Sequence, residues 1–245
     1  MDLSTTKTFK IRACETDHLG QLKLSAIFQL MQEAADKNAK KLKLSYDKMN
    51  RLNEIWVLSR IHAKFFNIPK WEDEIKIKTW PVGVDGIFAI RDYLIQTTKG
   101  DLVGKITSSW LIVDAKKRRV KKMRDFPKSS DDRVLDKSAE RVRSPKEMTL
   151  VSTREVQKSE LDVNKHVNNA IYYNWITDSL SLEIYNEFMI DEILLNYSSE
   201  TRLGDKIGMY HNKISDKELY VIAKNENLEK IALVAKINLS KRTVL

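Results

Sequence analysis

The chain has little cysteine, proline and glycine: one Cys, four Pro and seven Gly among 245 residues. A single cysteine, Cys14, excludes an internal disulfide and any zinc site built from several cysteines. Four scattered histidines give no ligand cluster, so neither a metal nor a cofactor is expected. No stretch approaches the ~20 apolar residues of a membrane span, and residues 1–7 lack the apolar core of a secretory signal. We therefore expect a cytoplasmic protein of one or two domains, folded almost throughout.

The net charge of +9 is unevenly distributed along the chain. Residues 1–150 hold 31 Lys and Arg against 20 Asp and Glu, whereas residues 151–245 hold 12 against 14. Much of the excess lies in residues 116–124, with the sequence KKRRVKKMR. Such a run attracts acidic partners, and a solvated linker would show the same composition. A nucleic-acid partner is not favoured, because the run lacks interleaved aromatic residues and any known motif.

Residues 161–169, LDVNKHVNN, place a carboxylate, an amide and an imidazole at every second residue. In an extended backbone, alternate side chains point the same way, so Asp162, Asn164 and His166 can project together. These groups can move protons and polarise a carbonyl. Polar clusters are also common in turns and helix caps, so a turn cap is the alternative interpretation of Asp162, and a hydrogen-bonded loop residue that of His166.

The chain also contains a weak internal repeat. Residues 17–25 align with residues 162–170 at an offset of 145, and a pattern of apolar residues at helical spacing follows each segment. Strand patterns come next in both copies, where the offset falls to 132 because the helix region of the second copy is shorter. The predicted strands are residues 56–68, 75–80, 87–96 and 102–113 in the first copy, and residues 192–199, 206–212, 218–225 and 230–240 in the second.

This order of elements predicts an α+β fold, because one amphipathic helix can cover one face of an antiparallel sheet. A sheet wrapped round a long central helix is the hot-dog arrangement, and two copies make tandem hot-dog domains. We expect an N-terminal domain at residues 1–125, a linker at 126–145 where charge and proline break the periodicity, and a C-terminal domain at 146–245. Chance similarity between two α+β domains is the alternative explanation of the repeat.

The two copies differ where chemistry is expected. Asn164 aligns with Leu19 and His166 with Gln21, so the first copy keeps Asp17 but loses the amide and the imidazole. Leu and Gln cannot relay a proton. We therefore expect the second copy to act and the first copy to bind or shape the substrate.

Residues 161–169 resemble the signature of acyl-acyl carrier protein thioesterases, a family found in plant plastids and various bacteria. Shorter matches follow in the same order over most of the chain: IWVLSR at 55–60, PKWED at 69–73, TW at 79–80, SSW at 108–110 and LNYSSE at 195–200. The resemblance implies a tandem hot-dog hydrolase without a cofactor. It would cleave the thioester between a fatty acyl chain and the phosphopantetheine arm of its carrier protein, release free fatty acid and so terminate chain elongation.

The resemblance also places Asp162, Asn164, His166 and Glu200 on the family's catalytic residues. Many plant members have a cysteine directly after the glutamate, where this chain has Thr201. A cysteine acyl-enzyme is therefore disfavoured, because the only thiol lies in the first copy. Two other interpretations stay open: a hot-dog acyl-CoA thioesterase, and a non-catalytic protein that binds acyl chains or their carrier.

Hydrolysis would need an activated water and a site for the developing oxyanion. Glu200 or Asp162 is expected to orient or deprotonate the water, and the sequence leaves open which one is the base. His166 would polarise the carbonyl or hold a carboxylate, and Asn164 would orient the water or the carbonyl. The backbone amides of the two residues after His166, at the expected start of a helix, are candidate oxyanion donors.

The first copy is expected to select the acyl chain length. Inward residues of its helix, including Ile27, Phe28 and Met31, would line an acyl tunnel, in which each buried methylene is worth about 0.8 kcal/mol. Acyl carrier protein is small and acidic, so the basic run suits it as a partner. The candidate docking residues are Lys116, Lys117, Arg118 and Arg119. Association into a homodimer is compatible with the sequence, which does not decide it.

Overall fold

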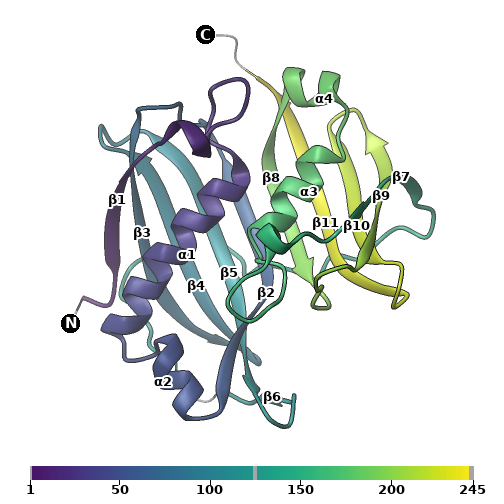
Figure 1. Ribbon diagram of the computed structural model, residues 1–245. Helices are drawn as coiled ribbons and strands as arrows, with labels where there is room; N and C mark the ends of the chain where they lie inside the picture. Colours follow the sequence, from purple (N-terminus) through teal and green to yellow (C-terminus); the bar gives the residue numbers. More distant parts are fainter. Residues whose placement is uncertain (1, 124–125, 243–245) are drawn as a thin grey trace. The chain divides into compact units, whose positions relative to one another are not determined.

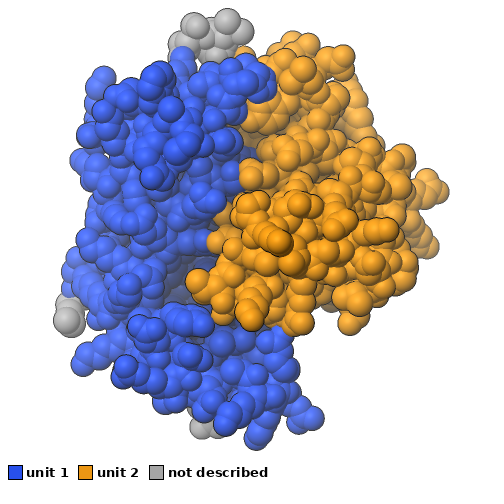
Figure 2. All heavy atoms as spheres, in the orientation of Figure 1, with its two compact units in different colours: residues 1–140 blue, residues 141–245 orange. Residues whose placement is uncertain are grey.

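The computed structural model describes residues 2–123 and 126–242, and the chain divides into two compact units, residues 1–140 and 141–245 (Figure 2). Each unit holds one antiparallel sheet with a helix against it (Figure 1). In the part of the chain that is described, no helix is both long and apolar enough to cross a membrane.

The sheet of the first unit has the strand order β1 (Thr5–Lys10), β3 (Glu74–Asp85), β4 (Phe88–Thr97), β5 (Leu102–Asp114) and β2 (Glu54–Phe65). All neighbours are antiparallel, and the short β6 (Val120–Lys121) pairs with β5. Along β3, Ile75 and Ile77 are buried while Lys76 is exposed, which is the period-two pattern of a half-buried strand. This alternation decides which face of the sheet receives the helix.

The helix α1 (Leu24–Lys41) lies against β1 and β3 of the first unit (Figure 1). Its buried side chains recur every three or four residues, so one apolar stripe faces the sheet. Before α1 comes a 3-10 turn, η1 (Ala13–Glu15), and after it a short helix, α2 (Tyr46–Arg51), lies against β2.

The second unit repeats the topology. Its order is β8 (Phe188–Tyr197), β11 (Lys230–Lys241), β10 (Glu218–Asn225), β9 (Lys206–Ser215) and β7 (Thr149–Glu155), again antiparallel throughout. The 3-10 turn η2 (Lys158–Glu160) and α3 (Ile171–Asp178) take the places of η1 and α1. Counted from β1 in the first unit and from β7 in the second, each sheet has the strand order first, third, fourth, fifth, second within its own copy. This agreement confirms the tandem α+β hot-dog prediction.

All eight predicted strands are present, although β3 continues to Asp85, beyond its predicted end, and β8 begins at Phe188, before its predicted start. The helix of the second copy is much shorter than the first, with 8 residues against 18. Two serines explain the break. The hydroxyl of Ser179 donates to the carbonyl of Ile176, and that of Ser181 accepts from the amide of Ile184 and so caps α4 (Leu182–Glu187).

Residues 126–140 cross the first unit as a strap. The amide of Ser129 donates to the carbonyl of Pro81, and the Nε of Arg133 lies 2.9 Å from the carboxylate of buried Asp92. The predicted linker at 126–145 thus begins as an ordered segment on the first sheet. The predicted domain bounds themselves stay a prediction.

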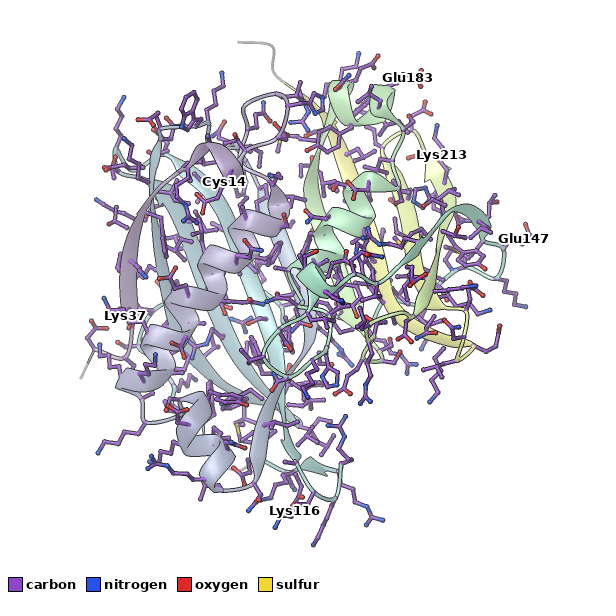
Figure 3. The ribbon with its side chains drawn as sticks, in the orientation of Figure 1. Cys14, Lys37, Lys116, Glu147, Glu183 and Lys213 are labelled. Atoms are coloured by element: carbon purple, nitrogen blue, oxygen red, sulfur yellow. The ribbon has the colours of Figure 1, made fainter. Side chains whose placement is uncertain are left out.

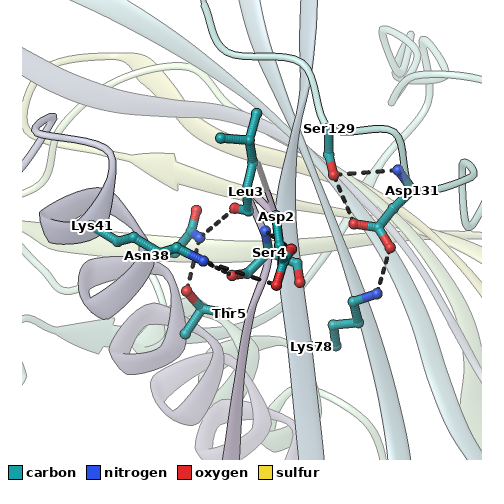
Figure 4. A network of polar contacts seen from close by, with 9 residues as sticks. All are labelled: Asp2, Leu3, Ser4, Thr5, Asn38, Lys41, Lys78, Ser129 and Asp131. Atoms are coloured by element: carbon teal, nitrogen blue, oxygen red, sulfur yellow. Dashed lines mark hydrogen bonds and ion pairs between the residues drawn. The ribbon is translucent and has the colours of Figure 1, made fainter.

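A polar network joins α1 to the N-terminal strand (Figure 4). The side-chain amide of Asn38 donates to the carbonyl of Leu3 at 2.8 Å, and the ammonium of Lys41 donates to that of Ser4 at 2.8 Å. The Oδ1 of Asn38 accepts from the guanidinium of Arg91 at 2.7 Å. Burial disfavours the charged form of Arg91 and so lowers its pKa. The hydrogen bond to Asn38 therefore helps to stabilise a guanidinium charge inside the unit.

Candidate active site

The residues that the sequence singles out in the second copy form a tight turn between η2 and α3. The amide of Asp162 donates to the carbonyl of His166 at 2.8 Å, and the amide of Lys165 donates back to that of Asp162 at 3.0 Å. Lys165 has a φ of +62°, in the left-handed region that closes such turns. The Oδ1 of Asp162 accepts from the amides of Asn164 at 2.8 Å and His166 at 3.3 Å.

A second segment is joined to this turn by the main chain. The amide of Val167 donates to the carbonyl of Thr201 at 3.0 Å. The hydroxyl of Thr201 is buried and lies 2.7 Å from the phenol oxygen of Tyr172, on α3. Burial raises the pKa of Tyr172 from its ordinary value of 10 to about 12. These bonds bring the residues just before Val167 and Thr201 together.

Those residues are His166 and Glu200. The Nε2 of His166 lies 3.2 Å from Oε2 of Glu200, although the residues are far apart in sequence. Their side chains are 21% and 37% exposed, so the pair is partly shielded yet reachable by a substrate. A guanidinium nitrogen of Arg202 lies 3.9 Å from the same carboxylate oxygen, and the side chain of Asn164 is exposed on the neighbouring turn.

A buried carboxylate, that of Glu160, stabilises the segment directly before the turn. Glu160, which is 8% exposed, accepts from the amide of Gln157 at 2.8 Å and from the indole of Trp175 at 2.9 Å, and it pairs with Arg154. Its carbonyl accepts from the amide of Asn168 at 2.9 Å. Neither Glu160 nor Tyr172 was predicted from the sequence to support the site. Only their neighbourhood to the polar segment could have drawn attention to them.

The prediction of oxyanion donors was wrong. The amides of Val167 and Asn168 donate to the carbonyls of Thr201 and Glu160, so neither is available to a substrate oxygen. The expected helix start was also misplaced, because α3 begins at Ile171. The Oδ1 of Asn168 accepts instead from the amide of Ala170 at 2.9 Å, in the turn that precedes the helix.

The matched family models cover both units. A model described as acyl-ACP thioesterase N-terminal domain matches residues 2–126, and one described as acyl-ACP thioesterase C-terminal domain matches residues 135–239. The chain belongs to the acyl-ACP thioesterase family. The suggestion made by residues 161–169 and the shorter motifs is thereby confirmed.

Individual relatives are distant. The oleoyl-acyl carrier protein thioesterase 1 of Arabidopsis thaliana is 25% identical over 229 residues, covering 84% of this chain and 62% of its own length. A dodecanoyl-[acyl-carrier-protein] hydrolase of Cinnamomum camphora is 26% identical, covering 79% of this chain and 55% of its own. The chain thus spans about three fifths of the curated relatives it matches.

Solved structures show the same fold. A 12:0-ACP thioesterase from Umbellularia californica superposes with a TM-score of 0.86 at 20% identity, covering 99% of both chains. An acyl-ACP thioesterase from Bacteroides thetaiotaomicron gives 0.83 at 21% identity, covering 97% of this chain and 98% of the other. At such identities the likeness concerns the tandem hot-dog fold.

The first domain of this family member has the same framework without the reactive side chains. The amide of Leu22 donates to the carbonyl of Pro69 at 2.8 Å, as that of Val167 does to Thr201. The equivalents of His166 and Glu200 are Gln21 and Ile68. The internal repeat is therefore present at the level of individual hydrogen bonds.

The predicted substrate-binding residues lie in the first domain. Ile27, Phe28 and Met31 are buried on α1, and the ring of Phe28 meets that of Phe65 edge-on with centroids 6.4 Å apart. Their part in an acyl tunnel stays a prediction. Among the described residues, no group of His, Cys, Asp and Glu side chains is arranged to hold a metal ion.

The predicted docking residues, Lys116, Lys117, Arg118 and Arg119, are exposed at the turn that joins β5 to β6; Lys116 is labelled in Figure 3. The Oδ1 of Asp114 accepts from the amides of Lys116 at 3.0 Å and Lys117 at 2.8 Å. These backbone bonds lower the pKa of Asp114 and hold the turn, so its four cations lie on an ordered segment. Arg124, the last residue of the basic run, lies outside the described residues.

Replacing Thr201 by valine tests the join between the two segments. The variant keeps the side-chain shape but leaves the buried phenol of Tyr172 without its Thr201 partner. We expect the free energy of unfolding, measured by urea denaturation, to fall by about 1–3 kcal/mol. The control Ser198→Ala, at an exposed residue of the same segment, should change it by less than about 0.5 kcal/mol. Equal values for both variants would show that the Tyr172–Thr201 contact does not stabilise the domain.

Proposed function

We propose that this chain hydrolyses the thioester of a fatty acyl-acyl carrier protein and releases free fatty acid. The observation that supports this most strongly is the 3.2 Å approach of His166 to Glu200, beside exposed Asn164, in a member of the acyl-ACP thioesterase family. The names of the plant relatives agree with this substrate class. The pair combines a carboxylate that can take a proton with an imidazole that can hold it in place.

Glu200 acts as the general base. It removes a proton from a water molecule, whose oxygen attacks the carbonyl carbon and forms a tetrahedral oxyanion. Collapse of this intermediate re-forms the carbonyl and breaks the carbon–sulfur bond, and the thiolate takes the proton back from Glu200. Water and thioester are thereby converted to carboxylic acid and thiol, with no covalent enzyme intermediate and no cysteine.

His166 and Asn164 support this reaction differently. The Nε2 of His166 donates to one carboxylate oxygen of Glu200. This bond keeps the other oxygen of Glu200 directed at the water. Asn164 is exposed on the turn that carries His166, and its side-chain amide donates to the carbonyl oxygen. It thus takes the role predicted for the backbone amides of Val167 and Asn168, which are already bonded. Asp162 is a poorer candidate for the base, because its Oδ1 already accepts two amide protons.

A ladder of acyl-carrier thioesters tests the proposed function. The wild-type protein should release free fatty acid from at least one chain length, measured by gas chromatography. His166→Ala and Glu200→Gln should each lower kcat by about 100- to 10 000-fold, because each removes one partner of the general-base pair.

The matched control is Gln21→Ala, at the first-copy equivalent of His166, which should keep kcat within about twofold of wild type. Matched acyl-CoA substrates distinguish the alternative acyl-CoA thioesterase, which would hydrolyse them at least as well. Binding of acyl carrier without release of fatty acid from any substrate would contradict the proposal and favour the non-catalytic binding protein.

We also propose that the acyl chain is bound in the first domain, along Ile27, Phe28 and Met31, and that the carrier protein docks on the basic turn at residues 116–119. The charge of this turn is opposite to that of an acidic carrier, and its backbone bonds keep it ordered. A cytoplasmic location and association into a homodimer stay predictions.

Charge reversal tests the docking surface. The double variant Lys116→Glu/Lys117→Glu should raise KM for acyl-carrier substrate about tenfold, because electrostatic attraction mainly speeds association. The KM for a small acyl-pantetheine thioester should not change. High salt should reduce the difference in KM for acyl-carrier substrate between the wild type and the variant. Lys146→Glu/Lys230→Glu, an equal change of charge at exposed residues of the second unit, is the control. Equal effects of the two double variants would place docking elsewhere.

A further inference from the structure

The two copies hold the same turn with the same aspartate. In the first copy, the Oδ1 of Asp17 accepts from the amides of Leu19 and Gln21, both at 2.9 Å. The amide of Asp17 donates to the carbonyl of Gln21 at 2.8 Å, and the amide of Gly20 donates back to that of Asp17 at 3.0 Å. Asp162 makes the corresponding four bonds in the second copy.

The agreement extends to the backbone conformation and to the flanking residues. Gly20 has a φ of +71°, where Lys165 in the second copy has +62°. The residues on either side of each turn form an isolated antiparallel bridge, Thr16 with Leu22 and Leu161 with Val167. The turn is therefore one structural unit that occurs twice in the chain.

The first copy has no chemistry to support, since Gln21 and Ile68 stand in place of the histidine and the glutamate. A carboxylate is nevertheless present and is used in the same way. We infer that Asp162 is a positioning residue: its carboxylate holds the turn that presents Asn164 and His166, and it neither takes a proton from water nor touches the substrate. This inference rests on the proposed function, because the positioned groups are the proposed catalytic ones.

The geometry supports this role over that of a base. The amides of Asn164 and His166 converge on one carboxylate oxygen, and hydrogen bonds to an ionised acceptor are about twice as strong as neutral ones. The other oxygen, Oδ2, lies 3.5 Å from the side-chain nitrogen of Asn164, at the outer limit of a hydrogen bond. Loss of the carboxylate would therefore release the amides that fix both side chains in the turn.

Two substitutions of Asp162 separate positioning from proton transfer. Asp162→Asn keeps an oxygen that can accept the two amides but cannot act as a base. We expect its kcat to stay within about tenfold of wild type, with the acidic limb of the pH–rate profile unchanged. Asp162→Ala should lower kcat about 100-fold or more, leave KM nearly unchanged and speed hydrogen exchange at the amides of Asn164 and His166.

Asp17 supplies the matched control within the same chain. Asp17→Ala should speed exchange at the amides of Leu19 and Gln21 and lower the Tm about as much as Asp162→Ala does, while kcat stays within about twofold of wild type. The exchange measurement needs no substrate. It therefore shows whether the carboxylate of Asp162 holds the turn, even if the wild type hydrolyses no thioester.

Either of two results would overturn the inference. One is a loss of 1000-fold or more in Asp162→Asn with the turn amides still protected, which would make Asp162 the base. The other is unchanged amide protection in Asp162→Ala, which would show that the carboxylate does not hold the turn.

Discussion

The hydrogen bond from the amide of Val167 to the carbonyl of Thr201 is the contact on which the site depends. His166 and Glu200 lie in separate segments, and each is the residue directly before one end of this bond. Because this main-chain hydrogen bond holds the two backbones side by side, the neighbouring side chains of His166 and Glu200 come within 3.2 Å of each other. Tyr172 and Glu160 hold the two segments from the side of α3 and η2.

Duplication separates the framework from the chemistry. Both copies contain the aspartate turn and its main-chain bond to a second segment, so these features serve folding in either domain. The side chains placed on that framework differ: Gln21 and Ile68 in the first copy, His166 and Glu200 in the second. The framework tolerates this difference because its bonds are made by the backbone and by one aspartate, whereas the variable side chains lie beside them.

Most of the fold could be predicted from the sequence, because period-two and helical patterns are local. The shorter helix region of the second copy follows from the reduced offset of the repeat, but the separate α4 was not predicted, since it depends on capping by Ser179 and Ser181 rather than on apolar spacing. Within the site, the residues of one turn could be predicted to lie together, but Glu200 could be placed only through the family resemblance. The oxyanion prediction failed because strand-like pairing, invisible in composition, uses the amide of Val167.

A double-mutant cycle on His166 and Glu200 tests the central claim that the two side chains work as one unit. The quantity measured is kcat/KM for an acyl-carrier thioester in the wild type, His166→Ala, Glu200→Ala and the double variant. We expect the double variant to lose about as much as the worse single one, with a coupling of at least about 100-fold, or roughly 2.7 kcal/mol. Losses that simply multiply would show that the side chains act independently and would contradict the account.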